Sequence, residues 1–289
     1  MNPPYPSDAQ AKAEILDAGR KIYQRGLVAA NDGNLSVRVG DNALWVTPTS
    51  VSKGAMTEDM LVKLSLDGTV LEGTRKPSSE TKMHLRIYQE NPAVRAVVHA
   101  HPPAATAFAA AGLPLDRPVL QEAVVQLGTV PVAPFALPGS QAVADSVAPY
   151  CQAYRALLLE YHGAVTWGTS MEQAHYRLEC LEQLATVTLH LRTLGIHRTM
   201  PESLVKALEG LRPAWGIQCP RCRSPPFGEG FPFPPAYWGQ FHTAYTKLFL
   251  KKQQKSQNFC KIFQKMMDRT GNLYYYINEN GQKKTVCPL

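Results

Sequence analysis

The stretch PSSETKMHLRIYQENPAVRAVVHAHPP, residues 77–103, decides the fold class. Ser78 or Ser79 can cap a helix that we expect to run to about Asn91. AVRAVVHAHP, residues 93–102, then reads as a buried strand that carries two histidines at its end. A helix followed directly by a buried strand is typical of an α/β domain.

Helix-start signals on both sides of this stretch extend the α/β pattern over residues 7–195. Ser7 and Gln10 have the spacing of a capping box, in which the serine caps the helix and the glutamine answers it. Ser170 and Gln173 have the same spacing before a long amphipathic segment. These signals predict one helix near the N-terminus and another after the last strand.

Short segments between these two helices predict strands. NDGNLSVRV (31–39), ALWVTPT (43–49) and RALLLEYHG (155–163) combine apolar or alternating residues with turn residues at one end. LVKLSLDGTVLEG (61–73) predicts a hairpin that turns at its Asp-Gly pair. With the strand at 93–102, these segments support one alternating α/β domain.

Length and composition limit the classes of protein to consider. The chain has 289 residues, 45% hydrophobic and 18% charged, which is enough for one large domain with an appendage. No apolar run approaches the about 20 residues that a bilayer-spanning helix needs, and the N-terminal segment lacks a secretory pattern. Six cysteines in a chain of this size do not predict a disulfide framework. We therefore expect a cytoplasmic enzyme with no membrane partner.

The composition changes after about residue 212. We divide the chain into an α/β domain at 1–212 and an irregular tail at 213–289, Pro/Cys-rich and then basic, which we expect to be poorly ordered. Cys219 and Cys222 form half of a structural zinc site, without a second pair at the usual spacing. The tail carries much of the net charge of +7. Solvated charge at a chain end explains it better than a nucleic-acid partner.

Three histidines form the strongest chemical pattern. His99 and His101 are two apart on the expected strand, so their side chains point to the same side. His162 ends another expected strand, and Gly163 after it lets the backbone turn closely. Three imidazoles with an open fourth position are the usual layout of a catalytic zinc site. An H-x-H pair alone also occurs in ordinary hydrogen bonding, and the helical His84 has that simpler interpretation.

Glu80 and several small polar residues surround this pattern. Glu80 lies at the start of the helix predicted after residue 77, where the helix dipole favours an anion. Near zinc, a carboxylate can remove a proton from carbon next to a carbonyl. The serines and threonine of the neighbouring turns are also ordinary cap or turn residues, but several on one rim suit a phosphate group. These phosphate candidates are Asn34, Thr49, Ser50, Ser78 and Ser79.

Five motifs in this order and spacing resemble the class II aldolase/adducin family: NDGNLSVR, VTPTS, KPSSETKMHLRIYQ, VVHAHPP and LLLEYHGAVTWG. The resemblance covers about residues 8–195. It implies a three-layer α/β/α fold with a central, mainly antiparallel sheet, and a homotetramer with active sites at subunit interfaces. One departure is Ser50, where the family's phosphate loop often has glycine.

The resemblance also implies an activity. One Zn²⁺ per subunit would be held by His99, His101 and His162, with Glu80 as the base and the five phosphate candidates on the binding loops. The reaction would be reversible cleavage of a ketose 1-phosphate, of the L-fuculose 1-phosphate kind, to dihydroxyacetone phosphate and an aldehyde. The partner is therefore a small phosphorylated sugar.

Glu122, within VLQEAVVQLG, leaves the type of reaction open. Aldolases of the family carry a tyrosine acid near this position, whereas related dehydratases carry a glutamate at a similar distance after H-x-H. Glu122 is thus a second candidate acid/base or a structural residue. The alternatives to an aldolase are an epimerase or dehydratase on the same zinc site, and a non-catalytic, adducin-like scaffold. Retention of three histidines and Glu80 argues against the scaffold.

Overall fold

The structure, a computed structural model, describes residues 4–217, 275–277 and 283–285. The chain divides into two units, Met1–Phe227 and Gly228–Leu289. The first unit contains the histidines and acidic residues singled out above.

The second unit has one described feature, an antiparallel pair between β9 (Tyr275–Ile277) and β10 (Lys283–Thr285). The Cys219–Cys222 pair and most of the predicted tail lie outside the described residues. The first unit continues past residue 212, because Ile217 is buried against it. The predicted domain boundary at residue 212 stays a prediction.

A single sheet of eight strands forms the centre of the first unit, in the order β4-β3-β2-β1-β5-β8-β7-β6. Its neighbours pair antiparallel except β6 and β7, which are parallel, so the predicted, mainly antiparallel sheet is confirmed. The strands are β1 (Asn34–Gly40), β2 (Ala43–Val46), β3 (Val62–Leu64), β4 (Val70–Glu72), β5 (Ala96–Ala100), β6 (Val132–Ala133), β7 (Ala156–Leu159) and β8 (Gly163–Gly168).

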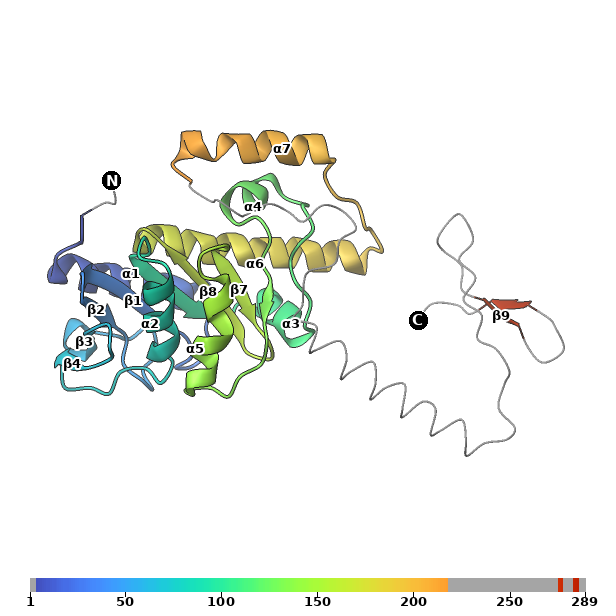
Figure 1. The fold of residues 1–289 in the computed structure, drawn as a ribbon. Coiled ribbons are helices and arrows are strands. Elements are labelled where there is room, and N and C mark those ends of the chain that lie inside the picture. The colour runs from blue at the N-terminus through green and yellow to red at the C-terminus, as the bar shows by residue number, and fades with distance from the viewer. Residues whose placement is uncertain (1–3, 218–274, 278–282, 286–289) are drawn as a thin grey trace, which may run out of the picture. The chain divides into compact units, whose positions relative to one another are not determined.

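Helices cover both faces of this sheet, which gives the expected three layers (Figure 1). One core lies between the sheet and α1, α3 and α6, and a second lies between the sheet and α2 and α5. The helices are α1 (Asp8–Gln24), α2 (Thr81–Glu90), α3 (Pro103–Ala110), α4 (Gln121–Gln126), α5 (Gln141–Val147), α6 (Met171–Thr193) and α7 (Glu202–Leu211), with short 3-10 turns at Glu58–Met60, Ala148–Tyr150 and Pro213–Trp215. None of the helices within the described part of the chain is long and apolar enough to cross a membrane.

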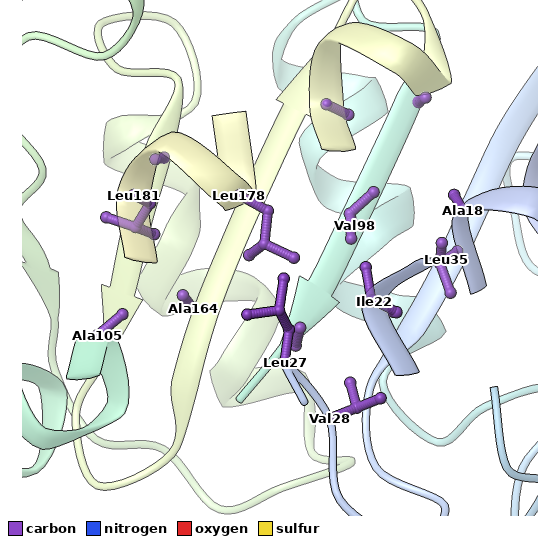
Figure 2. Packing of buried hydrophobic residues seen from close by; sticks show 14 of the residues in the cluster. Ala18, Ile22, Leu27, Val28, Leu35, Val98, Ala105, Ala164, Leu178 and Leu181 are labelled. Carbon is purple, nitrogen blue, oxygen red and sulfur yellow. The ribbon is translucent and has the colours of Figure 1, made fainter. Parts of the chain in front are cut away.

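The central strands are buried on both faces because helices pack on each side. Every residue of β5 and β8 is buried. Figure 2 shows the core on the α6 side, where Leu178 and Leu181 of α6 lie over Ala164 of β8, and Ile22 of α1 lies near Val98 of β5. Each fully buried leucine or isoleucine contributes about 1.5–3 kcal/mol. The strand ends that carry the histidines are therefore fixed by core packing.

The helix-start predictions have different outcomes. The capping box of Ser7 and Gln10 is confirmed at α1. Ser170 caps α6, but the side chain of Gln173 accepts a hydrogen bond from the Thr169 amide, so this box is not reciprocal.

The predicted cap of α2 is wrong, because the N-cap is Glu80 rather than Ser78 or Ser79. The Ser78 amide donates to the carbonyl of Thr47, and a β-bridge joins the preceding prolines, Pro48 and Pro77. This pairing keeps the chain extended up to Ser78, so the helix begins only after the following turn. Glu80 consequently stands at the tip of the helix.

Candidate metal centre and active site

The three predicted histidines meet at one end of the central strands. His99 is the fourth residue of β5, His101 directly follows that strand, and His162 lies in the turn between β7 and β8. The β5–β8 register places Ala100 opposite Ala164, which brings the β7–β8 turn beside the end of β5. The ring centroids are 4.7–4.9 Å apart in all three pairs. We call these three residues the histidine centre.

Hydrogen bonds leave the Nε2 atoms of two of these rings free to face one another. Nδ1 of His99 lies 2.9 Å from the carbonyl oxygen of Ala164, to which it donates. Nδ1 of His101 lies 3.3 Å from a carboxylate oxygen of Asp32. Both Nε2 atoms then carry lone pairs, yet they are only 3.1 Å apart. Two lone pairs at this distance repel one another unless a cation lies between them.

This donor set fits a small divalent metal ion. The ligand atoms of the histidine centre all lie within 4.8 Å of one another. Zn–N bonds of about 2.0–2.1 Å at tetrahedral angles separate the ligand nitrogens by roughly 3.4 Å. The Asp32 and Ala164 contacts are the kind of outer partner that fixes the tautomer of a metal-binding histidine. Burial lowers the pKa of His162 to about 4, which keeps its ring neutral and able to bind a metal at pH 7.

Glu80 faces the same point from the tip of α2. Its Oε2 lies 3.1 Å from Nε2 of His99, and its Oε1 lies 3.3 Å from Nε2 of His162. Oε1 is buried without a hydrogen-bond partner within the described residues. Burial by itself would raise the pKa of Glu80, whereas the hydrogen bond from the Asn34 amide favours its ionised form. The buried Oε1 is thus available to a cation or a substrate proton.

Gly163 allows this arrangement because it lacks a side chain, and not because its backbone adopts an unusual conformation. A Cβ at this position would lie 2.5 Å from Cδ2 of His101 and 2.6 Å from the carbonyl oxygen of Ala100. The start of β8 therefore passes directly against a histidine of the centre. The sequence predicted that Gly163 lets the backbone turn closely. In the structure the positive φ of this turn is at Tyr161, and Gly163 instead makes room for the His101 ring.

Comparison with protein families identifies this arrangement. Residues 13–189 match the family described as "Class II Aldolase and Adducin N-terminal domain". The chain belongs to the class II aldolase/adducin family. The predicted resemblance is therefore confirmed.

Named relatives in the family have more than one activity. The chain is 34% identical to the 3-oxo-tetronate 4-phosphate decarboxylase of Haemophilus influenzae, over 70% of this chain and 98% of the relative. It is 33% identical to the L-fuculose phosphate aldolase of Methanococcus maripaludis, over 63% and 97%. The crystal structure of YgbL from Klebsiella pneumoniae superimposes with a TM-score of 0.66 at 33% identity, covering 70% of this chain and 99% of that one.

In this class II aldolase-like domain, two exposed loops lie beside Glu80. The Pro48–Pro77 bridge holds them together, and the amide of Thr49 donates to the carbonyl of Lys76 at 3.0 Å. Four of the phosphate candidates lie on these loops, and we call them the phosphate rim: Thr49, Ser50, Ser78 and Ser79. The bridge and this hydrogen bond join the two loops, and phosphate binding by the rim stays a prediction.

The two remaining predicted site residues, Asn34 and Glu122, lie outside the phosphate rim. Asn34 is buried, and its side-chain amide donates to Oε2 of Glu80 at 2.7 Å, so its first partner is the carboxylate. Glu122 is exposed on α4 and accepts a hydrogen bond from Gln121. None of the contacts described within residues 4–217 joins Glu122 to the histidine centre. The structure of one chain therefore groups Glu80, but not Glu122, with the histidines.

Sequence reasoning missed Asp32 and His84. Asp32 lies in the turn before β1, where its sequence predicts only a turn residue. It contacts His101 from a distant part of the chain, so no local signal indicates it as an outer partner. His84 is one helical turn after Glu80, a spacing that could have linked the two residues.

Proposed function

We propose that this chain is a zinc-dependent lyase that breaks a carbon–carbon bond near the carbonyl of a small phosphorylated sugar. The convergence of three imidazoles and one carboxylate on a single point carries this proposal. His99, His101 and His162 would hold the ion and leave one position open to substrate. Zinc, when bound, acts as a Lewis acid that polarises a carbonyl and stabilises the charge that develops on its oxygen.

Glu80 would move the proton. In the direction of condensation, its carboxylate removes a proton from the carbon next to the substrate carbonyl. In the direction of cleavage, it returns that proton to the same carbon after the bond breaks. Its place at the N-cap of α2, partly shielded from water, keeps the carboxylate beside the open side of the histidine centre.

The phosphate rim would fix the other end of the substrate. Ser78 and Ser79 contribute hydroxyls next to the N-terminal end of α2, where the helix dipole favours an anion. Thr49 and Ser50 approach from the adjacent loop, and Asn34 would contribute through its remaining amide hydrogen. The phosphate would then bind at the rim, and the carbonyl, on the carbon next to the phosphorylated one, would bind at the histidine centre.

The first candidate reaction is reversible cleavage of a ketose 1-phosphate to dihydroxyacetone phosphate and an aldehyde. Cleavage also requires that a hydroxyl of the departing aldehyde lose its proton. Glu122 is our candidate for this second acid/base, supplied by a neighbouring subunit of a homotetramer, since it is exposed in the single chain. Sedimentation of the purified protein at several concentrations, together with the activity of Glu122→Gln, tests this role.

The second candidate is decarboxylation of a 3-oxo sugar-acid phosphate. The 34% identity to a 3-oxo-tetronate 4-phosphate decarboxylase along nearly the whole relative favours it. Loss of CO₂ from a 3-oxo acid leaves the same type of enediolate, but no hydroxyl has to be deprotonated. Glu80 alone would then pass a proton taken from water to the enediolate carbon, which suits a site with one acid/base group in the chain.

One assay separates these candidates from each other and from a scaffold. Purified, zinc-loaded protein is incubated with a panel of ketose 1-phosphates and 3-oxo sugar-acid 4-phosphates, and dihydroxyacetone phosphate and CO₂ are measured separately. Both reactions release dihydroxyacetone phosphate, so an aldolase should release it from ketose 1-phosphates without CO₂ and a decarboxylase should release it from 3-oxo acid phosphates together with CO₂. We expect either release to stop when zinc is removed and to return when it is added. A folded sample that neither contains nor takes up zinc would contradict the proposal and support the adducin-like scaffold. Products without carbon–carbon cleavage would instead support an epimerase or a dehydratase.

A further inference from the structure

Behind Glu80, polar side chains of a helix and a strand alternate in one line. Glu80, His84 and Tyr88 are four residues apart, so they lie on one face of α2. Asn34 and Ser36 are two residues apart, so they lie on one face of β1. The two series interlock in the order Glu80, Asn34, His84, Ser36, Tyr88. We call these five residues the polar line.

Short hydrogen bonds join each member of the polar line to the next. The distance is 2.7 Å from Asn34 Nδ2 to Glu80 Oε2, and 2.6 Å from His84 Nε2 to Asn34 Oδ1. Nδ1 of His84 lies 2.7 Å from Oγ of Ser36, which lies 2.8 Å from the hydroxyl of Tyr88. The line therefore runs without a gap from the carboxylate into the core between the sheet and α2.

The carboxylate sets the direction of every hydrogen bond in the line. An ionised carboxylate only accepts, so the Asn34 amide nitrogen donates to Glu80 and its oxygen faces His84. Nε2 of His84 must then carry the ring proton, and Nδ1 accepts from the Ser36 hydroxyl. The Tyr88 hydroxyl completes the series, with Oγ of Ser36 at 2.8 Å and the carbonyl oxygen of Ser36 at 3.1 Å as its acceptors. One tautomer of His84 is therefore compatible with the line.

Because the polar line is buried, its hydrogen bonds cannot change direction without leaving a group unpaired. The four members behind Glu80 are each at most 4% exposed, so water cannot replace a missing partner. A buried polar group without a partner costs about 1–3 kcal/mol, so a half-satisfied line is less stable than an apolar core. Burial also lowers the pKa of His84 to about 3, which keeps the ring neutral. Apolar side chains would fill this part of the core at lower cost, so the line has a purpose other than packing.

We propose that His84 is a positioning residue for the proton transfer by Glu80. Held as the Nε2–H tautomer by Ser36 and Tyr88, it fixes the Asn34 amide with its nitrogen toward the carboxylate. The amide in turn holds Oε2, which leaves Oε1 toward the reacting atoms. This inference rests on the proposed role of Glu80 as base, while the tautomer itself does not depend on any activity.

The tautomer is measured first, by two-bond ¹H–¹⁵N correlation spectra of the imidazole rings in the zinc-loaded wild-type protein. We expect the His84 ring to show a protonated Nε2 and an unprotonated Nδ1, and Ser36→Ala to weaken this preference. A protonated Nδ1 in the wild type would overturn the proposal. This result stands even if no substrate is turned over, so failure of the proposed function is distinguished from failure of the polar line.

Kinetic variants then test the consequence. We expect His84→Leu to lower kcat about 10–100-fold, the range seen when an outer partner of a metal site is lost. Zinc content and KM should change little. His84→Gln, whose amide can still donate toward Asn34, should recover part of the loss. His175 on α6, which is 3% exposed and outside the line, gives the matched control. His175→Leu should keep the wild-type kcat wherever it is folded.

Thermal unfolding separates positioning from stability. If His84→Leu is too unstable to assay, His84→Gln and Ser36→Ala are compared at a temperature where both are fully folded. Loss of kcat in these folded variants supports the proposal. Wild-type kcat in folded His84→Leu, or in folded Ser36→Ala where His84→Leu cannot be assayed, would overturn it, because the line would then serve only the core.

Discussion

The histidine centre and the phosphate rim lie next to each other, but they are built in different ways. The centre stands on paired strands: β5 and β8 are buried throughout, and their register brings His99, His101 and His162 together. The rim stands on two loops joined by a single β-bridge, and Ser50 and Ser79 are exposed. Strand pairing gives the precise positions that metal binding needs, whereas loops present amides and hydroxyls that can adapt to a phosphate.

This contrast predicts that changes in the centre act on metal and chemistry, while changes in the rim act on substrate affinity or local stability. The largest effect should come from His101→Ala, which removes one of three ligands. We expect bound zinc and activity to be lost together, measured by elemental analysis and turnover. His175→Ala, at a buried place away from the centre, should retain both. Full zinc occupancy in His101→Ala would contradict the proposal that the histidine centre binds the metal.

The next effect should come from Glu80→Gln, which keeps the shape of the side chain but removes its basicity. We expect zinc content and unfolding temperature to stay near those of the wild type, while turnover falls about 10²–10⁴-fold. Steady-state kinetics on the substrate found by the panel, together with elemental analysis, measure both. Full activity would remove Glu80 from the mechanism and leave the histidine centre intact.

A smaller effect should follow from Gly163→Ala, because the new methyl group would collide with His101. We expect zinc affinity to fall about 10–100-fold, in the range for disturbed outer contacts of a metal site. Competition with a chelator measures the change. Gly210→Ala on α7, where an added methyl group has open space, is the control and should leave zinc affinity unchanged.

The smallest effect should come from the rim. Ser50 has a φ of 59°, in the left-handed region where a side chain is strained and glycine is not. We expect Ser50→Gly to raise the free energy of unfolding by about 0.5–1 kcal/mol without changing zinc content. Chemical denaturation measures it. Ser79→Gly lacks this strain and should not stabilise; equal stabilisation by both changes would show that strain at Ser50 is not the cause.

The sequence by itself determined the class of fold and the residues of the histidine centre. Periodicity, capping signals and turn residues depend on neighbours in the chain, so α1, α6, the β3–β4 hairpin and the strand carrying His99 were predictable. H-x-H on a strand also places two imidazoles on one side through local geometry alone.

Only the tertiary structure decided how distant segments meet. The β-bridge before Ser78 delays the start of α2 and makes Glu80 the N-cap, which no local signal indicates. The approach of Gly163 to His101, the Asp32 contact and the interlocking of α2 with β1 depend on strand register and helix docking. These are long-range contacts, and a residue pattern describes only the periodicity of each element, not the partner that the folded chain brings to it.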